Sequence, residues 1–228
     1  MTSESNLRDA WNHLALGARM ALAQQWMGLA AGGLPCGSSI LNDQEQVVAV
    51  GRNHVYDLPE KATTPTTSPL QYTRVAHAEI NALALVPSNR EPELLTLWTT
   101  QHPCLMCAAV LQFLGIGKVW YIADDPSDVS PTRDIIASRG NIPYKALGER
   151  LWWTVSNLLF LYNSAVSQGE DASNLRKNRD RYPLLVQLVL QIAKDDPLGK
   201  SARAGIELPQ ALLPYSPAIL HTALKSDL

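Results

Sequence analysis

The chain of 228 residues is predicted to form a layered α/β domain followed by an all-helical extension. Up to about residue 147, short apolar runs alternate with segments whose apolar residues recur at helical spacing, which is the pattern of a sheet covered by helices. After Gly148 the helical spacing continues, but no strand signal is found. We therefore expect an α/β domain at residues 1–148 and a helical C-terminal extension at residues 149–228.

The N-terminal elements are predicted to be a helix and a hairpin. Residues 7–29 carry apolar side chains at helical spacing, so one amphipathic helix is expected there, ended by Gly32 and Gly33. Strands are expected at residues 37–41 and 47–50. The Asn42-Asp43 turn signal between them predicts a hairpin.

A loop and further alternating elements follow the hairpin. Residues 57–70 are rich in Pro and Thr and have no apolar period, and a loop of this length is typical of lids and mobile segments. The next elements are expected at residues 75–86 (helix), 94–99 (strand), 103–114 (helix, with Pro103 in its first turn), 118–122 (strand), 131–138 (helix) and 143–147 (strand). Because a helix joins the last two strands, their pairing is expected to be parallel. The extension is expected to hold helices at 151–166 and 182–193, separated by the charged segment 170–181.

The bulk composition is that of a soluble globular protein. Hydrophobic residues make up 46% of the chain and charged residues 18%, which excludes a disordered chain. The three cysteines are too few for a secreted disulfide scaffold. The first residues lack the apolar region of a signal peptide, and the longest apolar runs fall short of the roughly 20 residues of a membrane span. A cytoplasmic protein without a membrane partner is expected.

Two short strings carry ligands for a metal. They are His77-Ala78-Glu79 and Pro103-Cys104-Leu105-Met106-Cys107, and each is predicted to open a helix. The His77 nitrogen and the Cys104 and Cys107 thiolates supply three ligands for one Zn²⁺ per chain. The fourth tetrahedral position is then left to water, as in catalytic zinc sites. The positive ends of the helix dipoles favour the thiolate forms that a metal requires.

Glu79 is the candidate proton carrier. It lies two residues after His77, near the metal without being forced to bind it, and a carboxylate there can take a proton from metal-activated water. The activated water would attack a ring carbon that bears an amino group, and ammonia would leave. His-x-Glu followed by Pro-Cys-x-x-Cys is the signature of zinc-dependent deaminases. Two alternatives remain: a redox Cys-x-x-Cys pair, and a structural zinc site with His102 as the fourth ligand.

The resemblance extends beyond the metal motif. The strings GRN (51–53), TRVAHAEINAL (73–83), LWTTQHPCLMCAAVL (97–111) and IGKVWYIADD (116–125) resemble the cytidine deaminase-like superfamily. Within it, they are similar to the branch of tRNA adenosine deaminases and bacterial guanine deaminases, in which His is the first zinc ligand. The resemblance implies a three-layer α/β/α fold with a five-stranded mixed sheet and a homodimer. It also implies that Asn53 and the backbone amides of Ala78 and Cys104 contact the substrate.

Three departures from the family pattern concern the substrate. His102 stands where the family commonly has Glu, and is therefore a further candidate for substrate contact. The 23 residues between Asn53 and His77 form a longer loop than is expected for a tRNA-editing enzyme. The helical extension has no counterpart in the pattern.

The charge distribution favours a small substrate. Residues 1–150 hold 11 Lys and Arg against 14 Asp and Glu, a net charge of -3, so no basic field is available to hold RNA phosphates. The one basic cluster, Arg176 to Arg181, is typical of a solvated helix start. We therefore expect a deaminase of a free nucleobase, nucleoside or related amino-heteroaromatic compound. The alternatives are a tRNA adenosine deaminase and a non-catalytic zinc module whose helical tail binds a protein.

Overall fold

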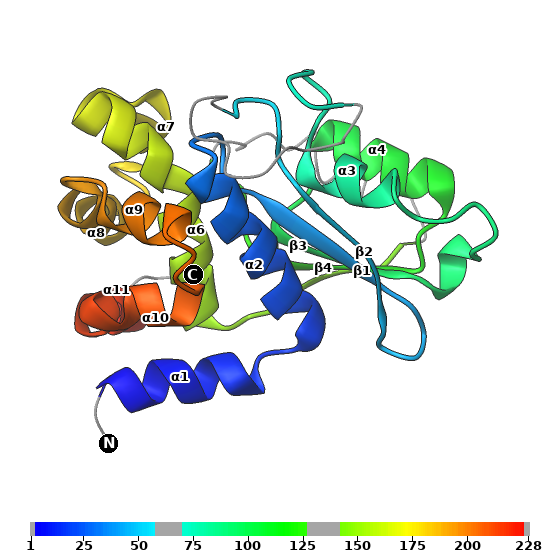
Figure 1. The fold of residues 1–228 in the computed structure, drawn as a ribbon, viewed down its shortest axis with the longest axis horizontal. Coiled ribbons are helices and arrows are strands. Elements are labelled where there is room, and N and C mark those ends of the chain that lie inside the picture. The colour runs from blue at the N-terminus through cyan, green and yellow to red at the C-terminus, as the bar shows by residue number, and fades with distance from the viewer. Residues whose placement is uncertain (1–2, 58–69, 127–141, 226–228) are drawn as a thin grey trace.

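The computed structural model describes residues 3–57, 70–126 and 142–225, and its centre is a five-stranded mixed sheet (Figure 1). The strands are β1 (Gly37–Leu41), β2 (Val47–Arg52), β3 (Thr96–Gln101), β4 (Lys118–Ala123) and β5 (Tyr144–Ala146), in the spatial order β2-β1-β3-β4-β5. Strand β1 is antiparallel to both β2 and β3, whereas β3, β4 and β5 are parallel. The predicted hairpin, mixed sheet and parallel last pair are confirmed.

Helices cover both faces of the sheet. One face is covered by α2 (Leu16–Ala30) and α6 (Arg150–Gln168), and the other by α3 (Ala78–Leu83) and α4 (Leu105–Leu114). The core under α3 and α4 is built from apolar residues of the sheet and of these two helices. The three-layer α/β/α arrangement is therefore confirmed. Gly115 ends α4 in a left-handed conformation, with φ at 71°, which glycine adopts without a steric penalty.

The prediction of one N-terminal helix was wrong, because the chain forms two. Helix α1 (Ser3–His13) ends before Leu14, and Ala15 is extended with ψ at 140° before α2 begins. Leu7 and Leu14 are both buried in the same core as α2. The apolar spacing therefore continues across the break, which is why periodicity alone did not reveal it. The break lets α1 turn away from the sheet and pack on α10 and α11 (Figure 1).

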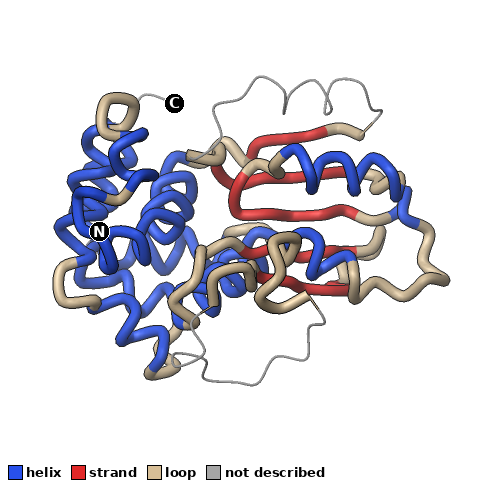
Figure 2. The backbone as a smooth tube through the Cα atoms, turned by 90° about the horizontal axis from the view of Figure 1, so that it is seen from above, coloured by secondary structure: helices blue, strands red, loops and turns tan. Residues whose placement is uncertain are grey.

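The C-terminal extension is helical, as predicted. After α6 come α7 (Ser173–Asn178), α8 (Pro183–Ala193), α9 (Pro197–Arg203), α10 (Leu208–Leu212) and α11 (Ser216–Lys225), with 3-10 turns at Gly169–Asp171 and Leu213–Tyr215. The segment expected to separate two helices holds α7, and the three last helices were not predicted. Figure 2 shows the helices gathered at one side of the sheet.

The extension shares one hydrophobic core with the α/β part. This core joins side chains of α1, α2, the sheet and the C-terminal helices, and Trp152 and Leu158 of α6 are completely buried in it. The proposed domain boundary at residues 148 and 149 therefore falls just before α6, a helix that packs directly on β4.

Two predicted segments cannot be compared with the structure. The helix at residues 131–138 and most of the 57–70 loop lie outside the described residues. Within the described ranges, no helix combines the length and the apolar character needed to cross a membrane.

Candidate metal centre

The two motif strings meet at the starts of α3 and α4. His77 and Cys104 are the N-cap residues of these helices, and both have an extended backbone with ψ at 157° and 169°. Cys107 lies in the first turn of α4 and is completely buried. Each string opens a helix, as predicted, but α3 begins at Ala78 and not at residue 75, and α4 begins after Cys104 and leaves Pro103 just outside the helix. The extended N-cap backbones project the first ligand of each string toward the other.

The three side chains have the spacing of a tetrahedral metal site. Nδ1 of His77 lies 3.4 Å from Sγ of Cys104 and 3.6 Å from Sγ of Cys107. All three ligand atoms lie within 4.8 Å of one another. Zinc bonds of about 2.3 Å to sulfur and about 2.0 Å to nitrogen, at tetrahedral angles, place the two atoms about 3.5 Å apart. The residues therefore fit zinc, and one imidazole with two thiolates is a donor set that zinc prefers.

The fourth position is open to a non-protein ligand. Among the described residues, only His77, Cys104 and Cys107 form a group of metal-ligand type, and His102 is not part of it. Nδ1 of His102 instead lies 3.0 Å from the carbonyl oxygen of Pro103. Its ring meets Tyr121 edge-on at 4.6 Å and stacks on Tyr144 at 5.7 Å. This geometry argues against His102 as the fourth ligand of a structural site.

Glu79 is buried beside the metal group. Its Oε2 lies 3.4 Å from Sγ of Cys107, and its Oε1 accepts a hydrogen bond of 3.3 Å from the Thr99 hydroxyl. Burial raises the pKa of the Glu79 carboxyl above its ordinary value, and the negative charge of Cys104 adds to this effect. A carboxylate with a raised pKa is a stronger proton acceptor than an ordinary carboxylate.

Hydrogen bonds among Cys104, Cys107 and His77 couple the pKa values of the three side chains. A bound cation would take the place of the protons in these hydrogen bonds. A hydrogen bond from Cys107 is the main cause that lowers the pKa of Cys104 to about 4, against the opposing effect of burial. The same hydrogen bond, together with burial, raises the pKa of Cys107. The hydrogen bond with Cys104 raises the pKa of His77. The lowered pKa favours the thiolate form of the half-buried Cys104, and a divalent metal would displace the remaining protons.

Asn53 is held next to the segment that precedes His77. The N–H of His54 donates to the carbonyl oxygen of Ala76 at 2.9 Å, and the Asn81 amide donates to the carbonyl oxygens of Arg52 and Ala76. The N–H of Val55 donates to Oδ1 of Asn53 at 2.9 Å. This bond orients the amide of Asn53 with its Nδ2 group as a hydrogen-bond donor. The end of β2 and the first zinc-ligand string therefore lie side by side.

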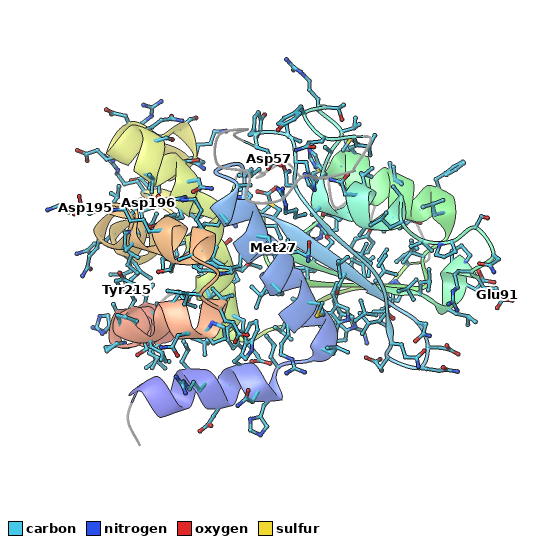
Figure 3. All side chains as sticks on the ribbon, viewed as in Figure 1. Met27, Asp57, Glu91, Asp195, Asp196 and Tyr215 are labelled. Atoms are coloured by element: carbon cyan, nitrogen blue, oxygen red, sulfur yellow. The ribbon has the colours of Figure 1, made fainter. Side chains whose placement is uncertain are left out.

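A buried ion cluster surrounds Asn53 in the sequence and was not predicted. Arg52 donates from both terminal nitrogens to the Asp57 carboxylate, at 2.7 and 3.0 Å, and Nδ1 of His54 lies 3.0 Å from the same carboxylate. Burial raises the pKa of Asp57, but the hydrogen bonds from His54 and Arg52 outweigh it, so the net shift is downward. Asp57 packs against the loop that follows α2 (Figure 3). The sequence signal for this cluster was the presence of two basic residues, Arg52 and His54, within five positions of Asp57.

Two further residues of interest, Ala78 and Cys36, have different surroundings. Ala78 is completely buried as the first residue of α3. Cys36, whose carbonyl oxygen accepts the N–H of Asn53, has a pKa raised by burial and by the nearby charge of Glu79.

Solved structures with a similar fold include several deaminases. A guanine deaminase from Nitrosomonas europaea matches 68% of this chain and 90% of its own, with 19% sequence identity and a TM-score of 0.46. A structure from a study of A-to-I editing by tRNA:A34 deaminases matches 56% of this chain and 93% of its own, with 23% identity and a TM-score of 0.42. At these identities the likeness concerns the fold alone.

Sequence comparisons place the metal group within a known family region. A segment of 83 residues is 30% identical to the uncharacterized deaminase in luxG 3'region of Aliivibrio fischeri. The match covers 36% of this chain and spans only 54% of the length of that relative. Residues 12–123 match the family model of the cytidine and deoxycytidylate deaminase zinc-binding region, which includes His77, Cys104 and Cys107. This region of the chain is therefore similar to the zinc-binding region of the cytidine and deoxycytidylate deaminases.

Proposed function

We propose that the protein is a zinc-dependent hydrolytic deaminase of a free nucleobase, nucleoside or similar amino-heteroaromatic compound. The observation that carries the proposal is the group of His77, Cys104 and Cys107 with a buried carboxylate, Glu79, in contact with Cys107. The match of residues 12–123 to a deaminase family model supports the same reaction class.

The chain's own residues account for the proton transfers. A bound zinc ion supplies the acidity that activates water for attack on a ring carbon bearing an amino group. Glu79 would take one proton from this water and deliver it to the ring nitrogen, and would then take the proton of the new hydroxyl group and deliver it to the departing amine. The carbon–nitrogen bond breaks, ammonia leaves and a carbonyl remains. The raised pKa of Glu79 suits this role, because the group has to gain and lose a proton in each turnover.

Substrate contacts are proposed at the ends of β2 and β3. Asn53 presents its Nδ2 donor next to the His77 segment, and the backbone amides of Ala78 and Cys104 lie at the starts of the two helices. We propose that His102, whose ring packs against those of Tyr121 and Tyr144, also contacts the substrate. The net charge of -3 on residues 1–150 favours a small substrate over RNA.

A homodimer is also proposed, in line with the family resemblance. Helix α4 leaves apolar side chains exposed on its outer side, with Phe113 88% exposed and Leu105 42% exposed. Exposed large apolar side chains that lie together mark association surfaces. Light scattering should give the mass of two chains for the parent protein. The variant Phe113→Glu should shift it toward one chain, and an unchanged dimer would exclude this face.

The deaminase proposal is tested by zinc content and ammonia release over a panel of bases and nucleosides. The variant Glu79→Gln should retain zinc and lose activity by roughly 100-fold to 10,000-fold, because general acid–base catalysis contributes that much. The variant Cys104→Ala should lose zinc, which checks the ligand assignment separately.

Four results would contradict parts of the proposal. Unchanged turnover in Glu79→Gln refutes the proton-transfer role, and full zinc occupancy in Cys104→Ala refutes the ligand set. Zinc without turnover of any base or nucleoside, combined with salt-sensitive RNA binding, would favour a tRNA deaminase. Zinc without activity on either class would favour a non-catalytic module.

A further inference from the structure

A cluster of buried polar side chains joins the helical extension to the end of β3. It consists of Gln25 of α2, Thr100 and Gln101 of β3, and Ser156 and Asn157 of α6, and we call it the polar cluster. Four of these residues have no exposed surface, and Gln101 is 4% exposed. Buried polar groups are costly unless they are paired, so the contacts within this cluster require an explanation.

Ser156 binds both the backbone and a side chain of β3. Its hydroxyl donates to the carbonyl oxygen of Thr100 at 2.9 Å and accepts from Nε2 of Gln101 at 2.9 Å. The Thr100 hydroxyl in turn donates to Oε1 of Gln101 at 2.7 Å and accepts from the N–H of Gly37 at 3.1 Å. One serine of the extension therefore fixes the last two residues of β3 through two directional bonds.

Gln25 closes the cluster from α2. Its Nε2 donates to the carbonyl oxygens of Ser156 and Pro35, at 2.9 and 3.0 Å, and lies 3.3 Å from Oε1 of Gln101. Helix α6, helix α2 and the segment that leads into β1 are thereby connected at one point. The end of β3 is held from two helices at once.

This end of β3 leads directly into the zinc-ligand string. Gln101 is followed by His102, Pro103 and Cys104, and the N–H of His102 is anchored to the carbonyl oxygen of Ala123 at 2.8 Å. One residue before the cluster, the Thr99 hydroxyl donates to Glu79. Thr99 therefore contacts the Glu79 carboxylate, while the next residue, Thr100, binds in the polar cluster.

The polar cluster is not what a core would contain for stability alone. Within the polar cluster, Oε1 of Gln25 and Nδ2 of Asn157 have no hydrogen-bond partner among the described residues. Leaving a buried polar group without a partner is unfavourable. Apolar side chains of similar volume would fill the same space without that penalty. The cluster adds directional bonds, which fix the position of β3 relative to α2 and α6. Apolar contacts would tolerate small shifts of the strand.

We infer that the helical extension positions the zinc site through the polar cluster, with Ser156 and Gln101 as positioning residues. Together they hold the end of β3, and through it the Pro103–Cys107 string and the Thr99 contact to Glu79, at the spacing that zinc requires. The inference rests on the proposed function, because it assigns the extension a role in the same metal site.

Two serine variants separate positioning from stability. Ser156→Ala removes the bonds to Thr100 and Gln101. The control Ser216→Ala removes a hydroxyl of α11 that is also completely buried and donates to a backbone carbonyl, that of Leu213, at 2.9 Å. Both variants lose a buried hydrogen bond from the same helical region, so both should show a lower melting temperature. Only Ser156 is connected to β3 by the bonds described above.

Zinc affinity is the deciding measurement. Competition with a chromophoric chelator should show roughly 10-fold weaker zinc binding in Ser156→Ala, the lower end of the effect of residues that orient metal ligands. Ser216→Ala should bind zinc as the parent does. With a substrate in hand, Ser156→Ala should lower kcat while KM stays near the parent value. Gln101→Met removes the bond to Ser156 from the strand side, together with the bonds of Gln101 to Thr100 and Gln25, and should give the same pattern if Ser156→Ala fails to fold.

The outcomes distinguish this inference from the proposed function. Equal zinc affinity in Ser156→Ala, Gln101→Met and the parent overturns the positioning role, whatever the activity. An equal loss of affinity in the Ser216→Ala control also overturns it, because the effect would then follow from stability. If the parent binds zinc but deaminates nothing, the proposed function fails, while a selective loss of affinity in Ser156→Ala still supports the positioning role.

Discussion

The ion cluster of Arg52, His54 and Asp57 gives a prediction whose size follows from its burial. The Asp57 side chain is 1% exposed and that of Arg52 is 8% exposed, and two hydrogen bonds join them. Removing one partner of such a pair leaves the other charge buried and costs about 3–5 kcal/mol. The variant Asp57→Asn keeps one acceptor oxygen, so we expect a loss near the lower end, about 3 kcal/mol. For a chain of this length, that corresponds to a fall in melting temperature of about 6–12 °C.

The dependence of this loss on pH follows from the lowered pKa of Asp57. An unfolded Asp titrates at about 3.9, so the stabilisation from the folded carboxylate is fully present above about pH 4. It is lost as the pH falls through the folded-state pKa, which lies below that value. Urea denaturation of the parent and Asp57→Asn should therefore show the full difference at pH 7 and a shrinking difference below pH 4.

An exposed ion pair provides the matched control. Arg179 and Glu170 lie 3.5 Å apart, with side chains 50% and 72% exposed, and pairs of this kind contribute less than about 1 kcal/mol. Glu170→Gln should therefore leave the urea midpoint almost unchanged. A loss below about 1 kcal/mol in Asp57→Asn at pH 7, or a difference that grows toward acid pH, would refute the reasoning.

Three further changes test the core and the metal. Trp152→Ala should cost about 3–5 kcal/mol in urea denaturation, because Trp152 is completely buried and its ring contacts Trp11. It should do so in one transition, and separate unfolding of the extension would contradict the shared core. Gly17→Ala should cost at least about 1–3 kcal/mol, since its Cβ would overlap the Trp98 ring, and a thermal melt unchanged from the parent would argue against that packing. Removing zinc with a chelator should lower the melting temperature, and an unaltered melt would speak against bound metal.

Much of the metal centre could be predicted from local sequence. His77 and Cys104 open helices, and the short spacings to Glu79 and Cys107 place each pair within about one helical turn. These relations span two or three residues, so the rules of helix starts and turns are sufficient to derive them. The association of the two strings came from a known signature and not from local geometry, because 27 residues separate His77 from Cys104.

The partners of Asn53 and Ser156 could not be predicted in the same way. The ion cluster beside Asn53 depends on how the chain turns after β2, and no apolar period describes that turn. Ser156 looks like an ordinary small residue in an apolar helix until α6 is packed on the sheet. Periodicity indicates that a helix buries a face, but it does not name the residues on the other side.

The sequence by itself determined the alternation of strands and helices, the helical nature of the extension and the four residues of the proposed metal chemistry. The strands and helices depend on spacings of a few residues, which local backbone geometry translates directly into structure, whereas the two metal-ligand strings were joined by a known signature. Only the tertiary structure decided that the N-terminal helix breaks at Ala15, that His102 packs between tyrosines, and that the extension holds the end of β3. These features follow from which surfaces bury one another, and that is a property of the whole chain.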